Sequence, residues 1–421
     1  MKRRRRYKLK KSIIILCIIF LVFFCGITFY LYKKHLIYQA KLLEEKRIAT
    51  IKNSYSEYVI TIKDSPIYDE DFNKVGTVSK DIFLSLDGIN DEYFLIDNFD
   101  DVYYIKYTDV IKTDSYIDKT DNRYKNYIPY NENILTSNKT DLYDEFDNLV
   151  LSLDKDYSFP IIIKESEKYG VEYSNRVMYV QKKDGKVIDN NNTNLSNTKG
   201  IPVLNYHFMY KDDDKSCQEI ICHSESLVRS HLDYIKDNKY FTPTMKELEM
   251  YIDNKIQLPK SVVITFDDGR YLNNVKNVIE EYKLNATFFI ISGWRWNIDF
   301  ANYQSDYLEL HSHTHKMHDV GECPTGQGGA IQCFSEEKIQ SDLKASRDTL
   351  YGTTYFAYPF YEYNDYSIAQ LKKAGFTMAF GGYYENGYKY VKPGINKFKL
   401  PRLVIYNKTA VSTIKNYLEL N

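Results

Sequence analysis

The chain has almost no net charge, with 56 Lys and Arg residues against 57 Asp and Glu residues among its 421. Domains that bind nucleic acid usually carry a marked excess of basic side chains. The balance therefore gives no reason to expect a nucleic-acid partner. The one basic cluster is at the N-terminus, in residues 2–6.

Cysteine is scarce, and no two cysteines have the Cys-x-x-Cys spacing of a structural zinc site. Cys17 and Cys25 fall in an apolar N-terminal segment. The other cysteines are even in number and could form disulfides in an extracellular domain: Cys217, Cys222, Cys323 and Cys333. The most local pairing joins 217 with 222 and 323 with 333, and the spacing leaves the other pairings open.

A small-residue cleavage pattern is also lacking after the apolar segment Ser12 to Tyr32. At about 1.5 Å per helical residue, this segment matches a hydrocarbon layer of roughly 30 Å. Without an Ala-x-Ala site, we expect an uncleaved transmembrane anchor rather than a signal peptide. The positive-inside rule then predicts a cytoplasmic tail over 1–11 and a single-pass cell-membrane protein with its remaining residues outside.

Residues 59–188 lack any long helical pattern and consist of short alternating segments typical of strands. The pattern of 67–70, Ile-Tyr-Asp-Glu, returns as Leu-Tyr-Asp-Glu in 142–145. After a linker over 33–58, we expect two all-β modules, 59–122 and 123–188. They resemble tandem bacterial SH3-like modules, which often accompany cell-wall enzymes, and either wall contact or a spacer role would suit them.

The polar, Asn-rich run 189–200 predicts an interdomain linker before a region of different texture. Over 201–421, apolar strands alternate with amphipathic helices predicted at 224–238, 271–282, 336–350 and 366–374. Alternation of this kind predicts an α/β domain built as a distorted (β/α) barrel, with its chemistry at the C-terminal ends of the strands.

Two adjacent carboxylates, Asp267 and Asp268, follow the apolar strand 262–266. Neighbouring side chains of an extended chain point to opposite sides, so one acid can bind a cation while the other handles a proton. Four of the eight histidines fall within 309–318, after a second apolar strand at 286–291. Imidazole and carboxylate together suit zinc or a similar divalent ion that keeps one position for water.

Three segments together, 265–269 (Thr-Phe-Asp-Asp-Gly), 312–314 (Ser-His-Thr) and 357–360 (Ala-Tyr-Pro-Phe), resemble the motifs of the polysaccharide deacetylase family, carbohydrate esterase family four. The resemblance covers roughly the second half of the chain. It implies that Asp267 is the general base. It also implies a divalent metal, zinc first with cobalt or nickel as alternatives, whose ligands are Asp268, His313 and His318.

The second histidine ligand is a choice between two frames. His318 lies five residues after His313, as in the family branch that acts on poly-β-1,6-N-acetylglucosamine in biofilms, which has a Ser-His-Thr-His-x-x-His motif. The frame of His311 with His315 has the spacing of four that is commoner in the family. This second frame places the Ser-His-Thr core out of register with the family motif, and it remains an alternative.

The same branch resembles this chain at 201–207, an apolar strand that ends in Tyr-His. By that resemblance His207 is the general acid that protonates the leaving amine. The Tyr-Pro-Phe motif implies an oxyanion and substrate element at Tyr358 and Phe360. Because Pro359 has no N–H, Phe360 is the expected backbone donor.

Two positions depart from the family pattern. Many members carry an Arg in the third motif that orients the base, and here Ala357 stands in that region. Arg402, at the start of a late strand, is a possible substitute. Tyr361 takes the place of a usual Gly, which could narrow the cleft or change the backbone angle behind the oxyanion donor.

The resemblance implies metal-dependent N-deacetylation of an extracellular polysaccharide containing N-acetylglucosamine, either poly-N-acetylglucosamine or peptidoglycan, with release of acetate. One alternative is an O-acetyl esterase of the same family. The other is a non-catalytic surface protein that binds the cell wall. The expected partners are an N-acetylated glycan, the membrane through the anchor, and the cell wall through the SH3-like modules.

Overall fold

The computed structural model describes residues 2–53, 58–90, 92–98, 101–113, 122–137, 139–154, 156–190, 199–294, 298–382 and 389–419. The chain forms two compact units. The first contains residues 1–121, 136–157 and 172–180, and the second contains residues 122–135, 158–171 and 181–421.

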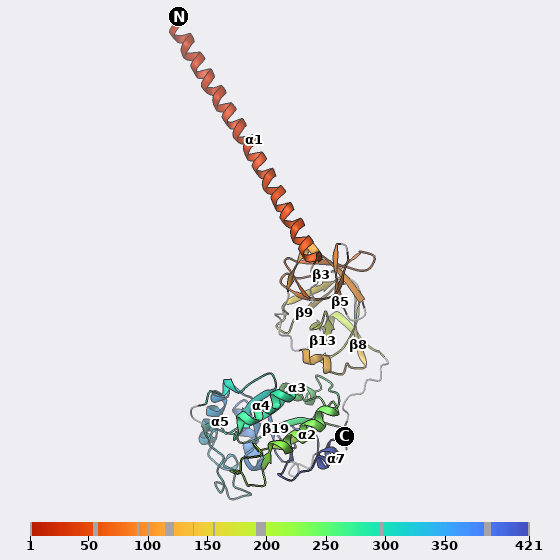
Figure 1. Cartoon of the computed structure of the whole chain (residues 1–421), viewed down its shortest axis with the longest axis vertical. Coiled ribbons are helices and arrows are strands. Elements are labelled where there is room, and N and C mark those ends of the chain that lie inside the picture. The colour runs from red at the N-terminus through yellow and green to blue at the C-terminus, as the bar shows by residue number, and fades with distance from the viewer. Residues whose placement is uncertain are drawn as a thin grey trace. The chain divides into compact units, whose positions relative to one another are not determined.

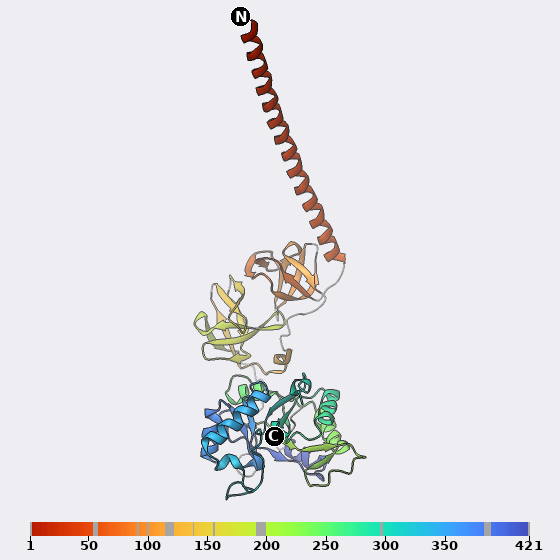
Figure 2. The same cartoon turned by 90° about the vertical axis from the view of Figure 1, so that its left-hand side faces the viewer.

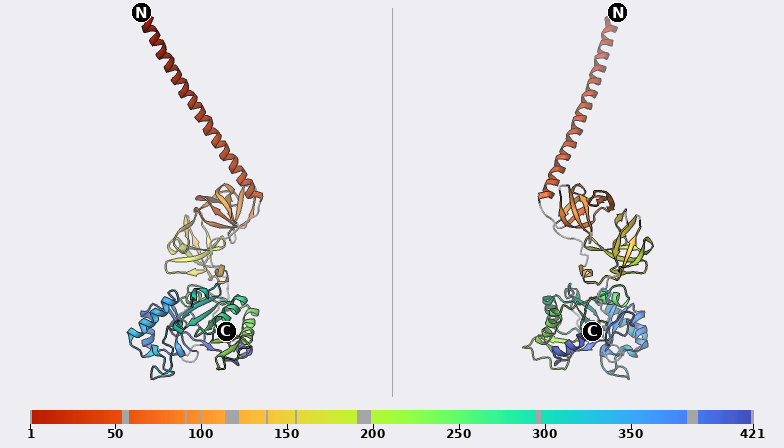
Figure 3. Two further views of the ribbon diagram at one scale, coloured as in Figure 1. Left: turned by 60° about the vertical axis from the view of Figure 1, so that its left-hand side comes forward. Right: turned by 90° about the vertical axis from the view of Figure 1, so that its right-hand side faces the viewer.

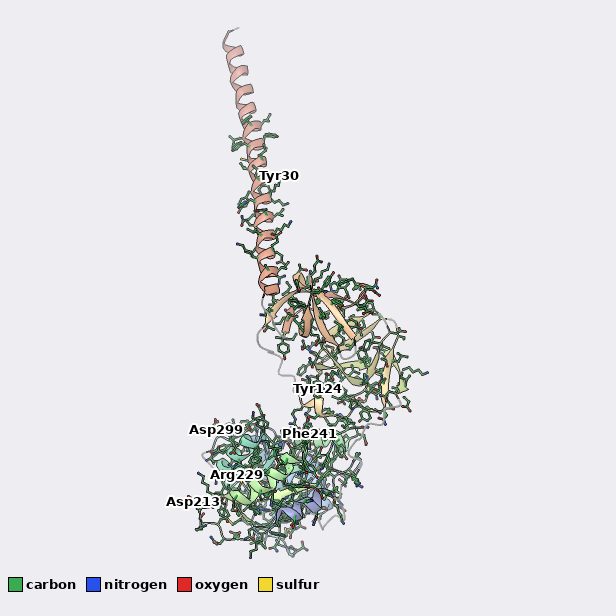
Figure 4. All side chains as sticks on the ribbon, turned by 45° about the vertical axis from the view of Figure 1, so that its right-hand side comes forward. Tyr30, Tyr124, Asp213, Arg229, Phe241 and Asp299 are labelled. Atoms are coloured by element: carbon green, nitrogen blue, oxygen red, sulfur yellow. A yellow bond between two sulfur atoms is a disulfide. The ribbon has the colours of Figure 1, made fainter. Side chains whose placement is uncertain are left out.

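The N-terminal part of the first unit is one helix, α1 (Lys2–Asn53), coloured red in Figure 1. Within it, Ile19–Ala49 is long and apolar enough to cross a membrane, a property that signal sequences share. Tyr30 projects from this stretch with its ring exposed (Figure 4). Near the end of α1, Arg47 donates a hydrogen bond of 3.0 Å to the Tyr107 carbonyl, which holds the helix end against the strands of the same unit.

Residues 58–189 fold into short strands. Their bounds are β1 (Tyr58–Thr61), β2 (Ser65–Tyr68), β3 (Lys74–Val78), β4 (Phe83–Ile89), β5 (Tyr93–Asn98), β6 (Asp101–Lys106), β7 (Val110–Thr113), β8 (Glu132–Thr136), β9 (Thr140–Tyr143), β10 (Leu149–Leu153), β11 (Ser158–Pro160), β12 (Ile163–Lys164), β13 (Lys168–Tyr173), β14 (Arg176–Gln181) and β15 (Gly185–Asp189). Strands of the first unit follow the order β14-β9-β10-β3-β2-β6-β5-β4-β1-β7, and the second unit has a small sheet β11-β8-β15.

The sequence echo at 67–70 and 142–145 corresponds to a structural repeat. Asp69 accepts two backbone N–H bonds from the turn that follows it, and Asp144 does the same in its own turn. An Asp side chain that bonds the backbone a few residues ahead stabilises a tight reversal. The strands after the two turns, β3 and β10, then pair antiparallel with each other.

The core of the second unit is a seven-stranded sheet in the order β23-β22-β21-β20-β19-β16-β24. Neighbouring strands in it run parallel. Its central strands are buried on both faces, which explains why their sequences are largely apolar. The bounds are β16 (Val203–Tyr206), β19 (Val263–Phe266), β20 (Ala286–Ile290), β21 (Leu308–Ser312), β22 (Tyr355–Ala357), β23 (Met378–Phe380) and β24 (Leu403–Val404), with β17 (Phe208–Tyr210) and β18 (Cys222–Ser224) pairing separately.

Helices surround this sheet (Figure 2), and Figure 3 shows them from two further sides. They are α2 (Glu225–Asp237), α3 (Met245–Ile252), α4 (Leu272–Tyr282), α5 (Glu336–Thr349), α6 (Asp365–Lys373) and α7 (Val411–Glu419). The four predicted helices are confirmed as α2, α4, α5 and α6. Ser224 caps α2 by accepting the Leu227 N–H, and the sequence prediction lacked α3 and α7.

The predicted barrel forms only in part, as a curled parallel sheet or half-barrel. Leu400 bridges to Phe380 beside one edge strand, and Leu403 pairs with Leu204 at the other edge. The segment 400–404 therefore reaches both edges of the sheet with strands only two or three residues long. Because the sheet curls, the C-terminal ends of its parallel strands lie around one common region.

Both disulfides of the second unit are local. Cys217 bonds Cys222, and Cys323 bonds Cys333. This is the shortest-range of the pairings that the sequence left open. The second disulfide closes a loop that begins shortly after His318.

Candidate functional site

The register of two central strands brings Asp267 and His207 to the same edge of the sheet. Tyr206 at the end of β16 lies opposite Phe266 at the end of β19. The next residue of each strand therefore emerges beside the other, and the Asp267 N–H donates a 3.0 Å hydrogen bond to the Tyr206 carbonyl. Strand pairing thus sets the spacing of these two groups before any side-chain contact is made.

Asp267 is buried and held by two side chains. Arg402 Nη1 donates to its Oδ1 at 2.8 Å, and Asn205 Nδ2 donates to its Oδ2 at 3.2 Å. Burial alone would raise the pKa of Asp267, but the charge and hydrogen bond of Arg402, together with His313 and His207, outweigh burial and leave that pKa below its ordinary value. The group is therefore a carboxylate, able to accept a proton, in a fixed orientation.

Three side chains converge on one point beside this pair. The Oδ1 atom of Asp268 lies 3.4 Å from Nε2 of His313 and 3.3 Å from Nε2 of His318, and the two nitrogens are 3.1 Å apart. Ligands about 2.0–2.1 Å from a tetrahedral zinc are about 3.3–3.4 Å from one another. The buried Asp268 Oδ1 has no hydrogen-bond partner among the described residues. The three atoms therefore fit a divalent cation.

Each proposed ligand is oriented by the fold. His313 Nδ1 donates to the Ala357 carbonyl at 2.8 Å, which leaves Nε2 free to bind a metal. Burial and the neighbouring His313 lower the pKa of His318 to about 4, so its imidazole is neutral near pH 7, as a metal ligand must be. Asp268 has φ 76°, a left-handed conformation that turns its carboxylate away from the direction of Asp267.

The alternative histidine frame does not converge. His311 Nδ1 bonds Thr353 Oγ1 at 2.8 Å, and His315 Nδ1 bonds Ser292 Oγ at 3.0 Å. In the described part of the chain, the one group of His, Cys, Asp and Glu side chains close enough to share a cation is Asp268, His313 and His318.

His207 is nearly buried, with its Nε2 3.4 Å from the Tyr361 hydroxyl. Burial lowers the pKa of His207, and the charges of Asp267 and Asp268 oppose this only in part. The His207 ring is therefore mainly neutral near pH 7, and once it has taken up a proton it is a strong donor to a departing group.

The Tyr-Pro-Phe segment separates its two aromatic residues. Phe360 has φ 56°, its N–H has no acceptor among the described residues, and its ring centroid lies 4.6 Å from that of His318. The side chain of Tyr358 is fully buried and its hydroxyl donates to the Phe398 carbonyl at 3.1 Å. The ring of Phe360 therefore lies beside the proposed ligand His318 and its N–H is free to donate, whereas the hydroxyl of Tyr358 is engaged in the core.

Sequence reasoning missed one member of the site and misread another. Asn205 bonds both Asp267 and the Tyr361 hydroxyl, so Tyr361 belongs to the site and is more than a departure from a motif. A signal for Asn205 was available. It is the polar residue of the apolar run 201–206, and it lies two positions before His207, hence on the same side of the strand.

Residues 254–379 match the family model described as polysaccharide deacetylase. This range contains the three converging ligands and Asp267, while His207 and Arg402 lie outside it. No curated protein sequence matched the chain.

Among solved structures, the chain is similar to a de-N-acetylase from Aggregatibacter actinomycetemcomitans, with 23% identity, 52% of this chain and 99% of that chain covered, and a TM-score of 0.44. IcaB from Ammonifex degensii gives 21% identity, coverage of 52% and 97%, and a TM-score of 0.44. A polysaccharide deacetylase from Bacillus cereus gives 17% identity, coverage of 80% and 98%, and a TM-score of 0.43. These TM-scores lie below 0.5, so the match of 254–379 is the stronger finding.

Proposed function

The chain carries a polysaccharide deacetylase domain and is a hydrolase of that family, and from this premise we propose that it removes N-acetyl groups from an extracellular polysaccharide containing N-acetylglucosamine. The observation that carries the proposal is the position of the Asp267–Arg402 pair directly beside the convergence of Asp268, His313 and His318. A base and a cation site next to each other are the two parts that metal-assisted amide hydrolysis needs.

Asp268, His313 and His318 would hold the divalent metal. When bound, the metal supplies a water of lowered pKa and polarises the acetyl carbonyl. Zinc suits two imidazoles and a carboxylate best, and cobalt or nickel would also be accepted. Asp267 takes the proton of the attacking water, and the ion pair with Arg402 keeps it ionised and oriented for this.

The remaining steps are assigned to Phe360 and His207. As water oxygen bonds to the acetyl carbon, negative charge develops on the carbonyl oxygen, toward which the free Phe360 N–H would donate. The carbon–nitrogen bond then breaks and the sugar nitrogen takes a proton from His207. The products are acetate and a glucosamine residue, whose amine becomes cationic.

Acetate release tests the proposal. The full-length chain, loaded with zinc, is given N-acetylglucosamine oligomers, peptidoglycan and an O-acetylated glycan, and is compared with Asp267→Asn and His313→Ala. Release from the N-acetylated substrates that both variants abolish supports N-deacetylation. Release from the O-acetylated glycan alone would favour the O-acetyl esterase. Equal inertness of all three proteins would leave a non-catalytic wall-binding protein as the better account.

The apolar part of α1 would act as a membrane anchor, with the deacetylase domain on the outer side of the cell. Two features support this: the basic residues that precede it, and the two disulfides, which persist in oxidising compartments. Protease treatment of intact cells tests the topology, since the domain should be digested while the basic residues before the apolar part of α1 are protected.

Contact with glycan through the β modules has one specific observation in its favour. Phe72 is 49% exposed, has φ 59°, and its ring centroid lies 5.0 Å from that of Tyr93 and 5.3 Å from that of Tyr104. Tyr68 adjoins the same group. A surface group of aromatic rings offers apolar faces for a sugar ring.

Binding of the Asp267→Asn chain to an insoluble N-acetylated glycan tests this contact. Phe72→Ala should weaken binding, while Phe146→Ala, an equally drastic change at the corresponding turn of the second repeat, should not. Equal binding by both variants would favour the spacer role.

A further inference from the structure

One of the two positions that depart from the family pattern, Tyr361, has an unusual backbone and a specific set of contacts. Its φ is 64°, and Phe360 before it has φ 56°, so two successive large residues adopt the left-handed conformation. This conformation is unfavourable for residues that have a Cβ and persists where surrounding contacts hold it. The contacts of the Tyr361 side chain therefore explain why a tyrosine is kept where a glycine would be easier.

The hydroxyl of Tyr361 lies between Asn205 and His207. It accepts from Asn205 Nδ2 at 3.0 Å and lies 3.4 Å from His207 Nε2. The guanidinium carbon of Arg402 lies 5.3 Å from the centroid of the Tyr361 ring, so the ring also packs against the group that holds the base. Burial raises the pKa of Tyr361, and its hydroxyl stays protonated through the neutral range.

Counting donors fixes the direction of the hydrogen bonds. Asn205 Nδ2 has two N–H groups, one donated to Asp267 Oδ2 and one to the Tyr361 oxygen. The hydroxyl therefore keeps its own proton to donate to Nε2 of the neutral His207 ring, and it has a second lone pair that can accept from the Nε2–H once that ring is protonated as the acid. Among the described residues, this hydroxyl is the only hydrogen-bond partner of the His207 ring, because Nδ1 has none.

We propose that Tyr361 is a positioning residue for the general acid of the deacetylation, its hydroxyl holding the His207 ring in the orientation from which the leaving amine is protonated. The inference rests on the proposed function and deepens it. Asn205 makes the orientation of acid and base interdependent, because the same amide nitrogen fixes Asp267 and the Tyr361 hydroxyl. An amide does not pass protons on, so the chain of contacts orients groups and does not conduct a proton between them.

The contact of 3.4 Å is long for a hydrogen bond, and catalytic hydrogen bonds commonly shorten when substrate binds. A glycine at 361 would leave the His207 ring without this contact. The tyrosine of the third motif thus supplies the polar contact that orients the ring of His207, at the end of β16. The residues next to His207 in the chain do not supply one.

The test exploits a difference between leaving groups. An amine leaves only when protonated, whereas the phenolate of 4-nitrophenyl acetate leaves unaided. Tyr361→Phe removes the hydroxyl and keeps the ring, so it should lower kcat on an N-acetylglucosamine oligomer by about tenfold to a hundredfold with little change in KM. Hydrolysis of 4-nitrophenyl acetate should change by less than about threefold. Tyr366→Phe, which removes an exposed hydroxyl bonded to the Phe334 carbonyl, is the matched control.

A double-mutant cycle gives the second readout. His207→Ala should show the same selective loss on the amide, and adding Tyr361→Phe to it should cost little more, because the hydroxyl then has no ring to hold. Equal losses on both substrates, no loss at all, or additive losses with His207→Ala would overturn the inference while the proposed function stands. A wild-type chain inert on both substrates would overturn the proposed function, and the inference with it.

Discussion

Arg402 and Asp267 are 135 residues apart in the sequence, yet Nη1 of Arg402 donates a 2.8 Å hydrogen bond to Oδ1 of Asp267. Arg402 is fully buried and enters from the segment that reaches both edges of the sheet. A charge in such a place is costly unless it is paired. The pair therefore serves both the fold, by holding the segment that carries Arg402 against the sheet, and the proposed base, by fixing its orientation.

Removal of one partner should reveal this double role. Arg402→Met leaves Asp267 as an uncompensated buried carboxylate, and we expect a loss of about 3–5 kcal/mol in the free energy of unfolding, together with loss of acetate release. The chain's two tryptophans, at 294 and 296, both lie in the deacetylase domain. Tryptophan fluorescence during urea unfolding therefore reports on that domain alone.

The double variant Arg402→Met with Asp267→Asn is the control. Because it carries neither buried charge, it should be more stable than Arg402→Met alone while remaining inactive. If the double variant is no more stable than the single one, the stability of the domain does not depend on the charge of this pair.

Metal content should distinguish the two histidine frames. His313→Ala removes one of three converging ligands and should lower bound zinc to near background, measured by elemental analysis of the purified chain. His311→Ala is the matched variant, since His311 bonds Thr353 instead, and should retain its metal. Loss of zinc from His311→Ala with retention in His313→Ala would reverse the assignment.

The disulfide Cys323–Cys333 should support the metal site. It closes the loop after His318, and the Glu362 carboxylate holds the same loop by accepting from the Gly329 N–H and from Gln332 Nε2, each at 2.9 Å. Replacing both cysteines by serine frees the segment that carries His318. We expect zinc affinity to fall about tenfold, as when an outer partner of a ligand is removed.

Serine substitutions at Cys217 and Cys222 provide the comparison, because that disulfide closes a loop that contributes none of the three ligands. Competition with a chelator of known affinity measures both variants. Equal zinc affinities for the two would show that the loop at 323–333 does not hold His318.

The stability of the domain should fall with acidity because of His223. This residue is fully buried, and both ring nitrogens lack a partner among the described residues. Burial, with repulsion from His207 and His231, lowers the pKa of His223 to about 3, whereas the unfolded chain keeps a value near 6.5. Between these values only the unfolded state takes up the proton, so stability present above pH 6.5 is lost as the pH falls toward 3.

Substitution measures this contribution. His223→Leu should reduce the slope of unfolding free energy against pH, between pH 6.5 and 3, by about 1.4 kcal/mol per pH unit, which corresponds to one proton. Urea unfolding at several pH values gives the slope. A variant with the wild-type slope would show that His223 is protonated in the folded domain.

The sequence predicted what depends on local pattern, and missed what depends on side chains that meet across the fold. Hydrophobic periodicity gave α2, α4, α5 and α6, whereas the sequence prediction missed α3 and α7, which have eight and nine residues, although each has an apolar face that the structure buries. Asp268, His313 and His318 came from motif spacing, and the structure brings them together.

Other relationships at the site could not be read from the chain. Arg402 was named from its place at a strand start, but its contact with Asp267 follows from the curl of the sheet. The link from Asn205 to Tyr361 joins residues 156 positions apart through side chains alone, and no periodicity reports such a contact. The disulfide pairing likewise depended on which loops the fold brings together.

One measurement tests the central proposal most directly: acetate and new primary amines counted together as the zinc-loaded full-length chain acts on N-acetylglucosamine oligomers. We predict one amine for each acetate. Asp267→Asn, with its zinc retained, should release neither product. Wild type should lose both products when the metal is removed and release both again when zinc is restored. Acetate without amine, or acetate release that Asp267→Asn leaves unchanged, would contradict the proposed N-deacetylation.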